Sequence, residues 1–342
     1  MSASSSSALP RWSPRTVGLA AAVVTVLIWT FFIVYARATA DPARGGLLTP
    51  FDIFYARLWG AGLVLLPWGW WLVRQARRSN PQAGSLFGLS PLSLRHTLIA
   101  GVSGGLLYGM FAYSGFVFAP AAHASVLMPG SLPLWTSLLA IGVLGERISG
   151  SRAIGLVCIV AGDLLVGGAS LLHAFDGSGV WRGDVLFMLA SFTWSVYSVT
   201  VRRLALEAVR ATIAITVLGF LVYVPIYTVL VLVQWVPGHV FTAPWGSVLP
   251  QMLFQGLGSV VVSGITFNVM IRHFGPVRST MITALVPGLS AVSAGIFLGE
   301  PLQWNLIAGL ALVTLGILFG VRKAAIAPVS GAAHAVSTGA RG

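Results

Sequence analysis

Charged side chains are scarce in this chain of 342 residues. They make up 8% of the sequence and only eight residues are acidic, whereas a soluble domain has roughly 25% charged residues. Hydrophobic residues make up 56%. So few charges cannot cover the surface of a folded chain in water, which excludes an ordinary soluble protein. We therefore predict an all-α integral membrane protein with lipid as its main solvent.

Cysteine and the common cofactor motifs are also missing. The only cysteine, Cys158, cannot form a disulfide within the chain, and no CxxC pair or Cys/His cluster is present. Such clusters are the usual ligands of structural zinc and iron–sulfur centres. The sequence has no glycine-rich loop ending in GK[ST], which argues against direct use of ATP. We therefore predict no metal and no cofactor.

The positive charge of the chain is spread over short loops. A net charge of +12 would indicate a nucleic-acid partner if it formed one patch. The basic residues instead fall between apolar segments, which is the pattern of membrane topology. We expect no nucleic-acid partner.

Ten apolar segments are long enough to cross a bilayer, whose core of about 30 Å requires about 20 residues of helix. The predicted spans are residues 16–36, 51–73, 96–118, 121–144, 149–170, 184–201, 211–235, 248–270, 277–298 and 303–321. We interpret residues 1–15 as a cytoplasmic N-terminal segment before an uncleaved first span. The small, polar residues of 323–342 predict a disordered cytoplasmic tail.

Basic residues are distributed unevenly between the two ends of these spans. With the N-terminus inside, sixteen of the twenty fall on the inner side, three on the outer side, and Arg57 lies within a span. The positive-inside rule then places both termini in the cytoplasm. We expect a multi-pass protein of the inner (plasma) membrane.

The second half of the chain repeats the first. An offset of 154 residues aligns Ser125 with Ser279, Pro133 with Pro287, Gly155 with Gly309 and Gly162 with Gly316, and an offset of 165 aligns Trp29 with Trp194. Each copy holds five spans, an odd number, so the second copy must insert upside down. Inverted repeats that move around a central site are a signature of secondary transporters. The sequence leaves a homodimer open.

Several short motifs recur in the order and spacing of a known family. They are Trp29 to Arg37, Thr49-Pro50 with Arg57, Leu144-Gly145-Glu146-Arg147, Trp181-Arg182-Gly183-Asp184, Ser191 to Tyr197, and Leu298-Gly299-Glu300-Pro301. Together they resemble the two EamA modules of the drug/metabolite transporter superfamily, here over 16–170 and 184–322. The resemblance implies a carrier that exports a small metabolite or drug, such as an amino acid-like solute. The expected partners are this small-molecule substrate and membrane lipid.

Two ionisable residues, Arg57 and Asp163, lie well inside predicted spans. Such residues are costly in a membrane and often functional. At ~1.5 Å per residue, both lie about 10 Å from the outer side, so a pair or a shared polar cavity is geometrically allowed. The structural alternatives are an ion pair that fixes two helices, or an Arg57 that extends to the headgroups. An unpaired Asp163 in a dry cavity would favour its protonated form and could bind a coupling proton.

Proline and aromatic residues mark a candidate midplane site. Two spans carry matched interruptions, Pro129-Gly130 with Pro133 and Pro287-Gly288, and paired breaks are typical of transporter sites. A kink needed only for packing is the alternative. Other candidates for the substrate cavity lie inside spans, where packing roles are also common: Trp29, Tyr108, Trp194, Tyr197 and Gln255.

Glu146 and Glu300 follow glycines at span ends and precede the next span, so we expect them to cap helices. Gly101-Val102-Ser103-Gly104 matches the GxSG pattern of intramembrane serine proteases, but no histidine is predicted at the depth of Ser103. Close helix packing explains these small residues better, and we expect no enzyme activity. A lipid-linked substrate flippase or a substrate-binding membrane receptor stays as the alternative function.

Overall fold

The computed structural model describes residues 13–40, 47–119, 121–172, 176–177, 179–299 and 304–321. Most of these residues are helical, and the one β-bridge among them joins Ser85 to Ser90. In chain order the elements are α1 (Pro14–Ala40), α2 (Pro50–Ala76), α3 (Leu94–Ala100), the π-helical η2 (Gly101–Leu107), α4 (Tyr108–Phe118), α5 (Ala121–Leu144), α6 (Gly150–Leu172), α7 (Trp181–Arg203), α8 (Ala208–Leu232), α9 (Trp245–Gln251), the π-helical η4 (Met252–Val262), α10 (Ser263–Phe274), α11 (Pro276–Thr283), α12 (Val286–Leu298) and α13 (Trp304–Val321).

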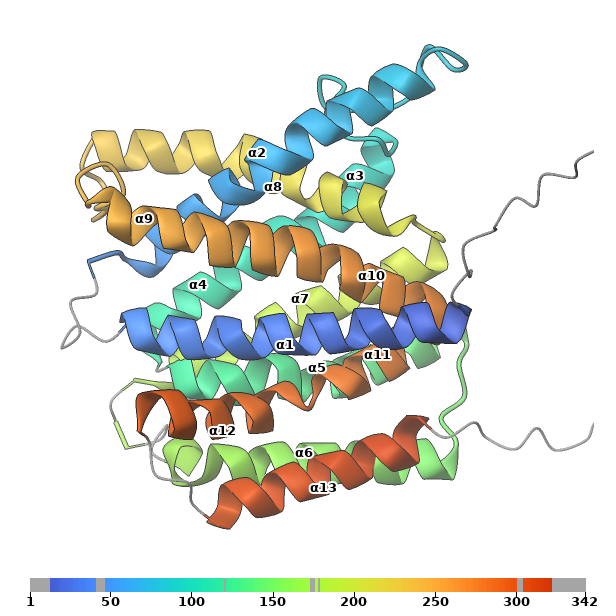
Figure 1. Ribbon diagram of the computed structural model, residues 1–342, viewed down its shortest axis with the longest axis vertical. Coiled ribbons are helices and arrows are strands. Elements are labelled where there is room, and N and C mark those ends of the chain that lie inside the picture. Colours follow the sequence, from blue (N-terminus) through green and yellow to red (C-terminus); the bar gives the residue numbers. More distant parts are fainter. Residues whose placement is uncertain are drawn as a thin grey trace, which may run out of the picture.

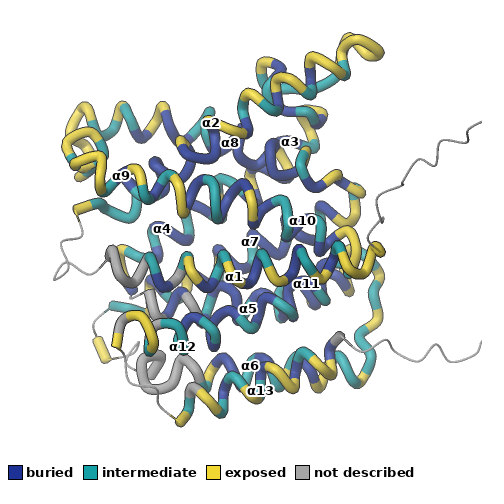
Figure 2. The backbone as a smooth tube through the Cα atoms, in the orientation of Figure 1, coloured by how far each residue is buried: buried dark blue, intermediate teal, exposed yellow. Residues whose placement is uncertain are grey.

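Seven helical segments in the described chain are long and apolar enough to cross a membrane. They are Pro14–Phe32, Leu94–Phe118, Val126–Leu144, Trp181–Arg203, Ala208–Leu232, Trp245–Phe274 and Pro276–Phe297. Exposed positions recur along the outer helices (Figure 2). Many of them carry large apolar side chains, as Leu19, Val23 and Leu27 do at every fourth residue of α1. Lipid solvates such a surface. The chain is therefore an all-helical, multi-pass membrane protein.

The helices form a flattened bundle (Figure 1). In the view of Figure 1, α2 and α8 form the upper edge and α6 and α13 the lower edge, with the other helices between them. The start of α1 and the end of α13 lie on the same side of the bundle (Figure 1). We call this side the terminus side.

Helices of the first half pack against helices of the second half in matching pairs. α1 packs on α10, and α7 packs on α4. α2 packs on η4, and α8 packs on η2. α1 also contacts α12, as α7 contacts α5. These contacts come in three pairs. In the second contact of each pair, both helices are replaced by the helices that align with them in the other half of the chain.

The most extensive helix contact, between α6 and α13, includes aligned glycines. A Cβ atom at Gly155 would lie 2.6 Å from the Gly316 carbonyl oxygen, and one at Gly162 would lie 2.7 Å from that of Gly309. Because Gly155 aligns with Gly309 and Gly162 with Gly316, this contact is reciprocal. It is also antiparallel, since the later residue of one helix meets the earlier residue of the other.

The proline-containing helices differ between the halves. α5 runs without a break through Pro129 and Pro133, although the sequence predicts an interruption there. Its carbonyls near the prolines accept hydrogen bonds from α7, with Ser191 Oγ donating to Met128 at 2.8 Å and Ser195 Oγ to Leu132 at 3.4 Å. In the second half, α11 ends at Thr283 and α12 begins at Val286, so the helix breaks just before Pro287.

Candidate functional site

A small cavity lies where the two halves meet. Three of the predicted cavity residues line it: Trp29 from α1, Tyr108 from α4 and Trp194 from α7. The other lining residues are Phe32, Met128, Pro129, Leu132, Ser191, Ser259 and Val286. The cavity volume is about 40 Å³, enough for a few water molecules but far below the roughly 300 Å³ of a small-molecule pocket.

Aromatic rings form the wall of this cavity. The aligned residues Trp29 and Trp194 face each other edge-on, with ring centroids 6.3 Å apart. Tyr108 packs on Trp194 at 4.8 Å, and Phe267 packs on Trp29 at 5.3 Å. Tyr197 is fully buried behind Trp194. The rings come from both halves, so a movement of one half against the other would change the cavity directly.

Arg57 is buried beside the cavity wall. Its Nη1 donates to Ser259 Oγ at 3.1 Å and to Gln255 Oε1 at 3.4 Å. The Tyr113 hydroxyl donates to the same Gln255 oxygen at 3.1 Å. Ser259 lines the cavity, which places the guanidinium one side chain behind the wall. The network joins α2 and α4 of the first half to η4 of the second.

Asp163 on α6 does not pair with Arg57. Its side chain is 3% exposed, and neither carboxyl oxygen has a hydrogen-bond partner in the described chain. The carboxyl group lies against Gly130 of α5, where a Cβ atom would come within 2.6 Å of Oδ2. Asp163 therefore packs against the proline-containing α5, whose Pro129 lines the cavity.

The remaining predicted cavity residues lie next to the wall. Pro133 follows the lining residue Leu132, and Pro287 follows the lining residue Val286. The Tyr197 hydroxyl accepts a hydrogen bond from Asn268 Nδ2 at 2.7 Å. Three members of the predicted set thus line the cavity, Arg57 and Tyr197 contact lining residues, and Gln255 binds Arg57, whereas Asp163 packs against Gly130 of α5.

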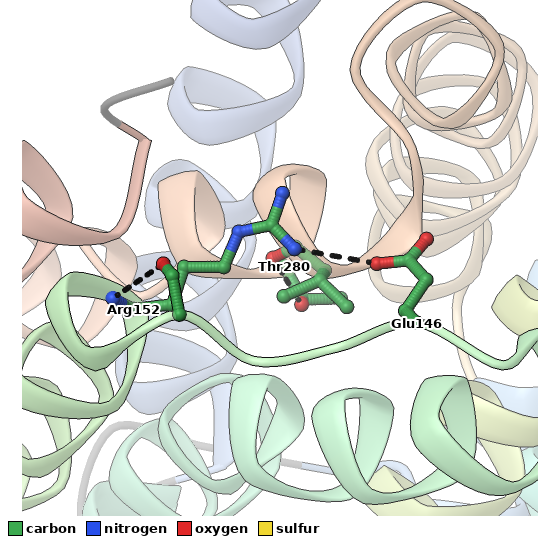
Figure 3. Close-up of polar contacts among 5 residues, drawn as sticks. Glu146, Arg152 and Thr280 are labelled. Atoms are coloured by element: carbon green, nitrogen blue, oxygen red, sulfur yellow. Dashed lines mark hydrogen bonds and ion pairs between the residues drawn. The ribbon is translucent and has the colours of Figure 1, made fainter. Parts of the chain in front are cut away.

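Glu146 lies at the terminus side of the bundle. Its backbone N–H donates to the Ala140 carbonyl at 3.1 Å, which closes the end of α5. Its carboxylate pairs with Arg152 Nη1 at 3.4 Å, above Thr280 of α11 (Figure 3). Arg202, His273 and Arg278 line the same polar pocket of about 260 Å³. Glu300, the second predicted cap, lies outside the described residues.

Asp52 is a buried acidic residue that the sequence analysis did not single out. It is fully buried, and its carboxylate accepts hydrogen bonds of 2.9 to 3.1 Å from Thr49, Tyr227, His239 and Val240. With Thr49 it forms the capping box of α2. The Thr-x-x-Asp spacing at 49–52 is the sequence signal for such a box, but it does not reveal the bonds to α8 and the following loop.

We expect Asp52→Asn to destabilise the protein by about 2 kcal/mol, because hydrogen bonds to a charged acceptor are lost or weakened. The midpoint of thermal unfolding in detergent measures this effect. Asn80→Asp is the control, because it makes the reverse exchange of the same two side chains in the exposed loop after α2. This variant should leave the midpoint unchanged. An unchanged midpoint for Asp52→Asn would contradict the assigned network.

Two further polar contacts bear on the sequence predictions. His123 of α5 and Asp184 of α7 form a partly buried pair with 2.8 Å between Nδ1 and Oδ1, which the sequence did not reveal. Ser103 of η2, the serine of the GxSG match, donates to the Ile99 carbonyl of the preceding α3 at 2.8 Å. The adjacent Gly104 lets the Tyr197 ring approach the backbone closely, as expected for helix packing.

The profile of the EamA-like transporter family matches residues 16–168 and 181–322. The chain belongs to this family. A curated relative, a probable amino-acid metabolite efflux pump of Salmonella typhimurium, is 24% identical over 250 residues, or 69% of this chain and 81% of the relative. The uncharacterized transporter YyaM of Bacillus subtilis is 22% identical over 240 residues, or 68% and 75% of the two chains.

An uncharacterized transporter of Archaeoglobus fulgidus is 23% identical over 226 residues, covering 65% of this chain and 76% of the relative. One crystal structure superposes with a TM-score of 0.65 and 19% identity, covering 90% of this chain and 97% of the other. At that identity the match shows the fold alone. The family and its named members make this protein a membrane transporter.

Proposed function

We propose that this transporter is a secondary active exporter of a small, amino acid-like metabolite, working by alternating access in the inner membrane. In this proposal ten spans form two inverted five-helix repeats, residues 16–170 and 184–322, with both termini in the cytoplasm. The name of the Salmonella typhimurium relative supports the substrate class and the direction.

The reciprocal contact between α6 and α13 carries the proposal. Aligned helices that meet antiparallel through aligned residues, Gly155 on Gly316 and Gly162 on Gly309, are what an in-plane two-fold axis between inverted repeats requires. The matching contacts of the other helices, such as α1 on α10 and α7 on α4, are also those expected of two halves related by a two-fold axis. The position of both described chain ends on one side of the bundle suits an even number of crossings.

The size of the central cavity supports movement of the halves. A volume of about 40 Å³ cannot hold a metabolite, so a substrate enters only when helices separate. Trp29, Tyr108 and Trp194 then form its walls, with Tyr197, Pro133 and Pro287 behind them. Arg57 and Gln255 supply the polar contacts, and Ser259 lies between them and the cavity.

Asp163 is the proposed site of proton coupling. An unpaired carboxylate is costly to bury away from water, so a movement of α5 that brings water to Asp163 would change its proton occupancy. Its contact with Gly130 places it against α5, the helix that carries Pro129 to the cavity. Protonation and the position of α5 are thereby linked.

Reconstitution into liposomes tests the function. We expect counterflow, in which vesicles loaded with an unlabelled amino acid accumulate the labelled form transiently, and net transport that an imposed pH gradient drives. Protein-free vesicles are the control. A purified, monodisperse protein that binds amino acids but carries none of them across the membrane would favour the receptor alternative and contradict the proposal.

A further inference from the structure

We propose that the transported solute carries a carboxylate and that Arg57 is the residue that binds it. This inference rests on the proposed function and specifies its substrate class. It starts from a positive charge inside the bundle for which the described chain supplies no counter-charge.

The guanidinium of Arg57 is buried with neutral partners only. Its side chain is 8% exposed, and its hydrogen bonds go to a serine hydroxyl and a glutamine amide. The ion pairs between described residues use other groups, His123 with Asp184 and Arg152 with Glu146. A buried charge is normally paired, because the cost of removing it from water is large. An anionic ligand would supply the missing partner.

The two hydrogen bonds of Arg57 are weak enough to exchange. Both come from Nη1, at 3.1 and 3.4 Å, whereas charge-assisted bonds from a guanidinium to a carboxylate are about 2.7–2.9 Å and often bidentate. Ser259 stands between Arg57 and the cavity as both its partner and part of the wall. A carboxylate that takes the place of Ser259 would therefore gain a stronger bond than the one it breaks.

The cavity wall itself offers a donor and no acid. Trp194 Nε1 is buried and has no hydrogen-bond partner in the described chain, although the Trp194 ring lines the cavity. Trp29 Nε1, by contrast, already donates to Ser263 Oγ at 2.9 Å. None of the lining residues is acidic, so the wall offers a cation no negative charge. An indole donor, a nearby guanidinium and aromatic walls fit an organic carboxylate with an apolar body.

A structural role for Arg57 is the competing explanation, because the same bonds hold α2 to η4. The two explanations differ in what they predict for ligands. A structural arginine sets stability alone, whereas a carboxylate-binding arginine also sets which ligands bind.

Matched ligands test the inference on the unmodified protein. Calorimetric titration of the purified full chain would compare leucine with leucinamide, and isocaproate with isopentylamine, so that each pair keeps the apolar body and changes the carboxylate. We expect the carboxylates to bind about tenfold or more tightly than their partners. Equal binding within the pairs, preferential binding of the amine, or no binding of either carboxylate would overturn the inference.

Variants then assign the effect to Arg57. Arg57→Met should lose the preference for carboxylates, and Arg57→Lys should retain part of it because the charge remains. Arg74→Met, on the exposed end of the same helix, should keep the full preference. If Arg57→Met folds and still prefers carboxylates, Arg57 does not bind them. Counterflow of isopentylamine but not of isocaproate would refute the substrate class while leaving the carrier function intact.

Discussion

Replacing Gly60 with alanine is expected to destabilise the protein by about 3 kcal/mol, because it forces two packed helices apart. Gly60 lies on α2, and a Cβ atom there would overlap the backbone carbonyl of Met252 in η4. A Cβ atom at Gly256 of η4 would in turn lie 2.7 Å from the Cα atom of Gly60. Neither side of this contact is a flexible side chain, so only a shift of α2 or η4 relieves the overlap. The unfolding midpoint in detergent measures the effect.

Gly142→Ala is the matched control for this substitution. Gly142 is also helical, on α5, but a Cβ atom there would meet nothing within 4 Å. The new methyl group should leave stability unchanged or raise it by about 0.5–1 kcal/mol, because alanine favours helix more than glycine does. Equal midpoints for the two variants would contradict the close packing of α2 on η4.

The second large effect is expected at Asp163. Asp163→Asn keeps the shape of the side chain but removes the group that binds and releases a proton. A gradient of one pH unit supplies about 1.4 kcal/mol per proton, or a tenfold accumulation. We therefore expect the variant to lose about tenfold of gradient-driven accumulation in proteoliposomes, while counterflow without a gradient continues.

Glu207→Gln is the control for the loss of a carboxylate. Glu207 is exposed and caps the start of α8, where its oxygens accept from Val209 and Arg210. This variant should respond to a pH gradient as the unmodified protein does. Normal transport by Asp163→Asn with an unchanged pH dependence would remove Asp163 from the coupling mechanism.

The sequence predicts the helical membrane fold well, because hydropathy and length act locally along the chain. The duplication also locates the centre of the bundle, since the aligned Trp29 and Trp194 meet there. The partner of Arg57 could not be predicted in the same way. Depth along the membrane places Arg57 and Asp163 at a similar level, but it does not give the direction in which each side chain points around its helix. The structure turns Arg57 towards η4 and Asp163 towards α5.

Contacts between distant segments account for the other differences. Pro129 and Pro133 have the pattern of a helix break, but hydroxyl groups of Ser191 and Ser195 on α7 bind α5 carbonyls close to them. The capping box of Asp52 is visible in the sequence, whereas its bonds to Tyr227 and the backbone of His239 join residues more than 170 positions away. Such pairings depend on how the helices pack, which no local pattern records.

Accessibility labelling of two aligned positions tests the inverted repeat most directly. With Cys158 replaced by alanine, single cysteines at Glu146 and Glu300 would be probed in intact cells with a membrane-impermeant thiol reagent. We expect the cysteine at 300 to react from outside and the cysteine at 146 to react only after the cells are opened. Reaction of both positions from the same face would contradict the inverted arrangement and the alternating-access mechanism built on it.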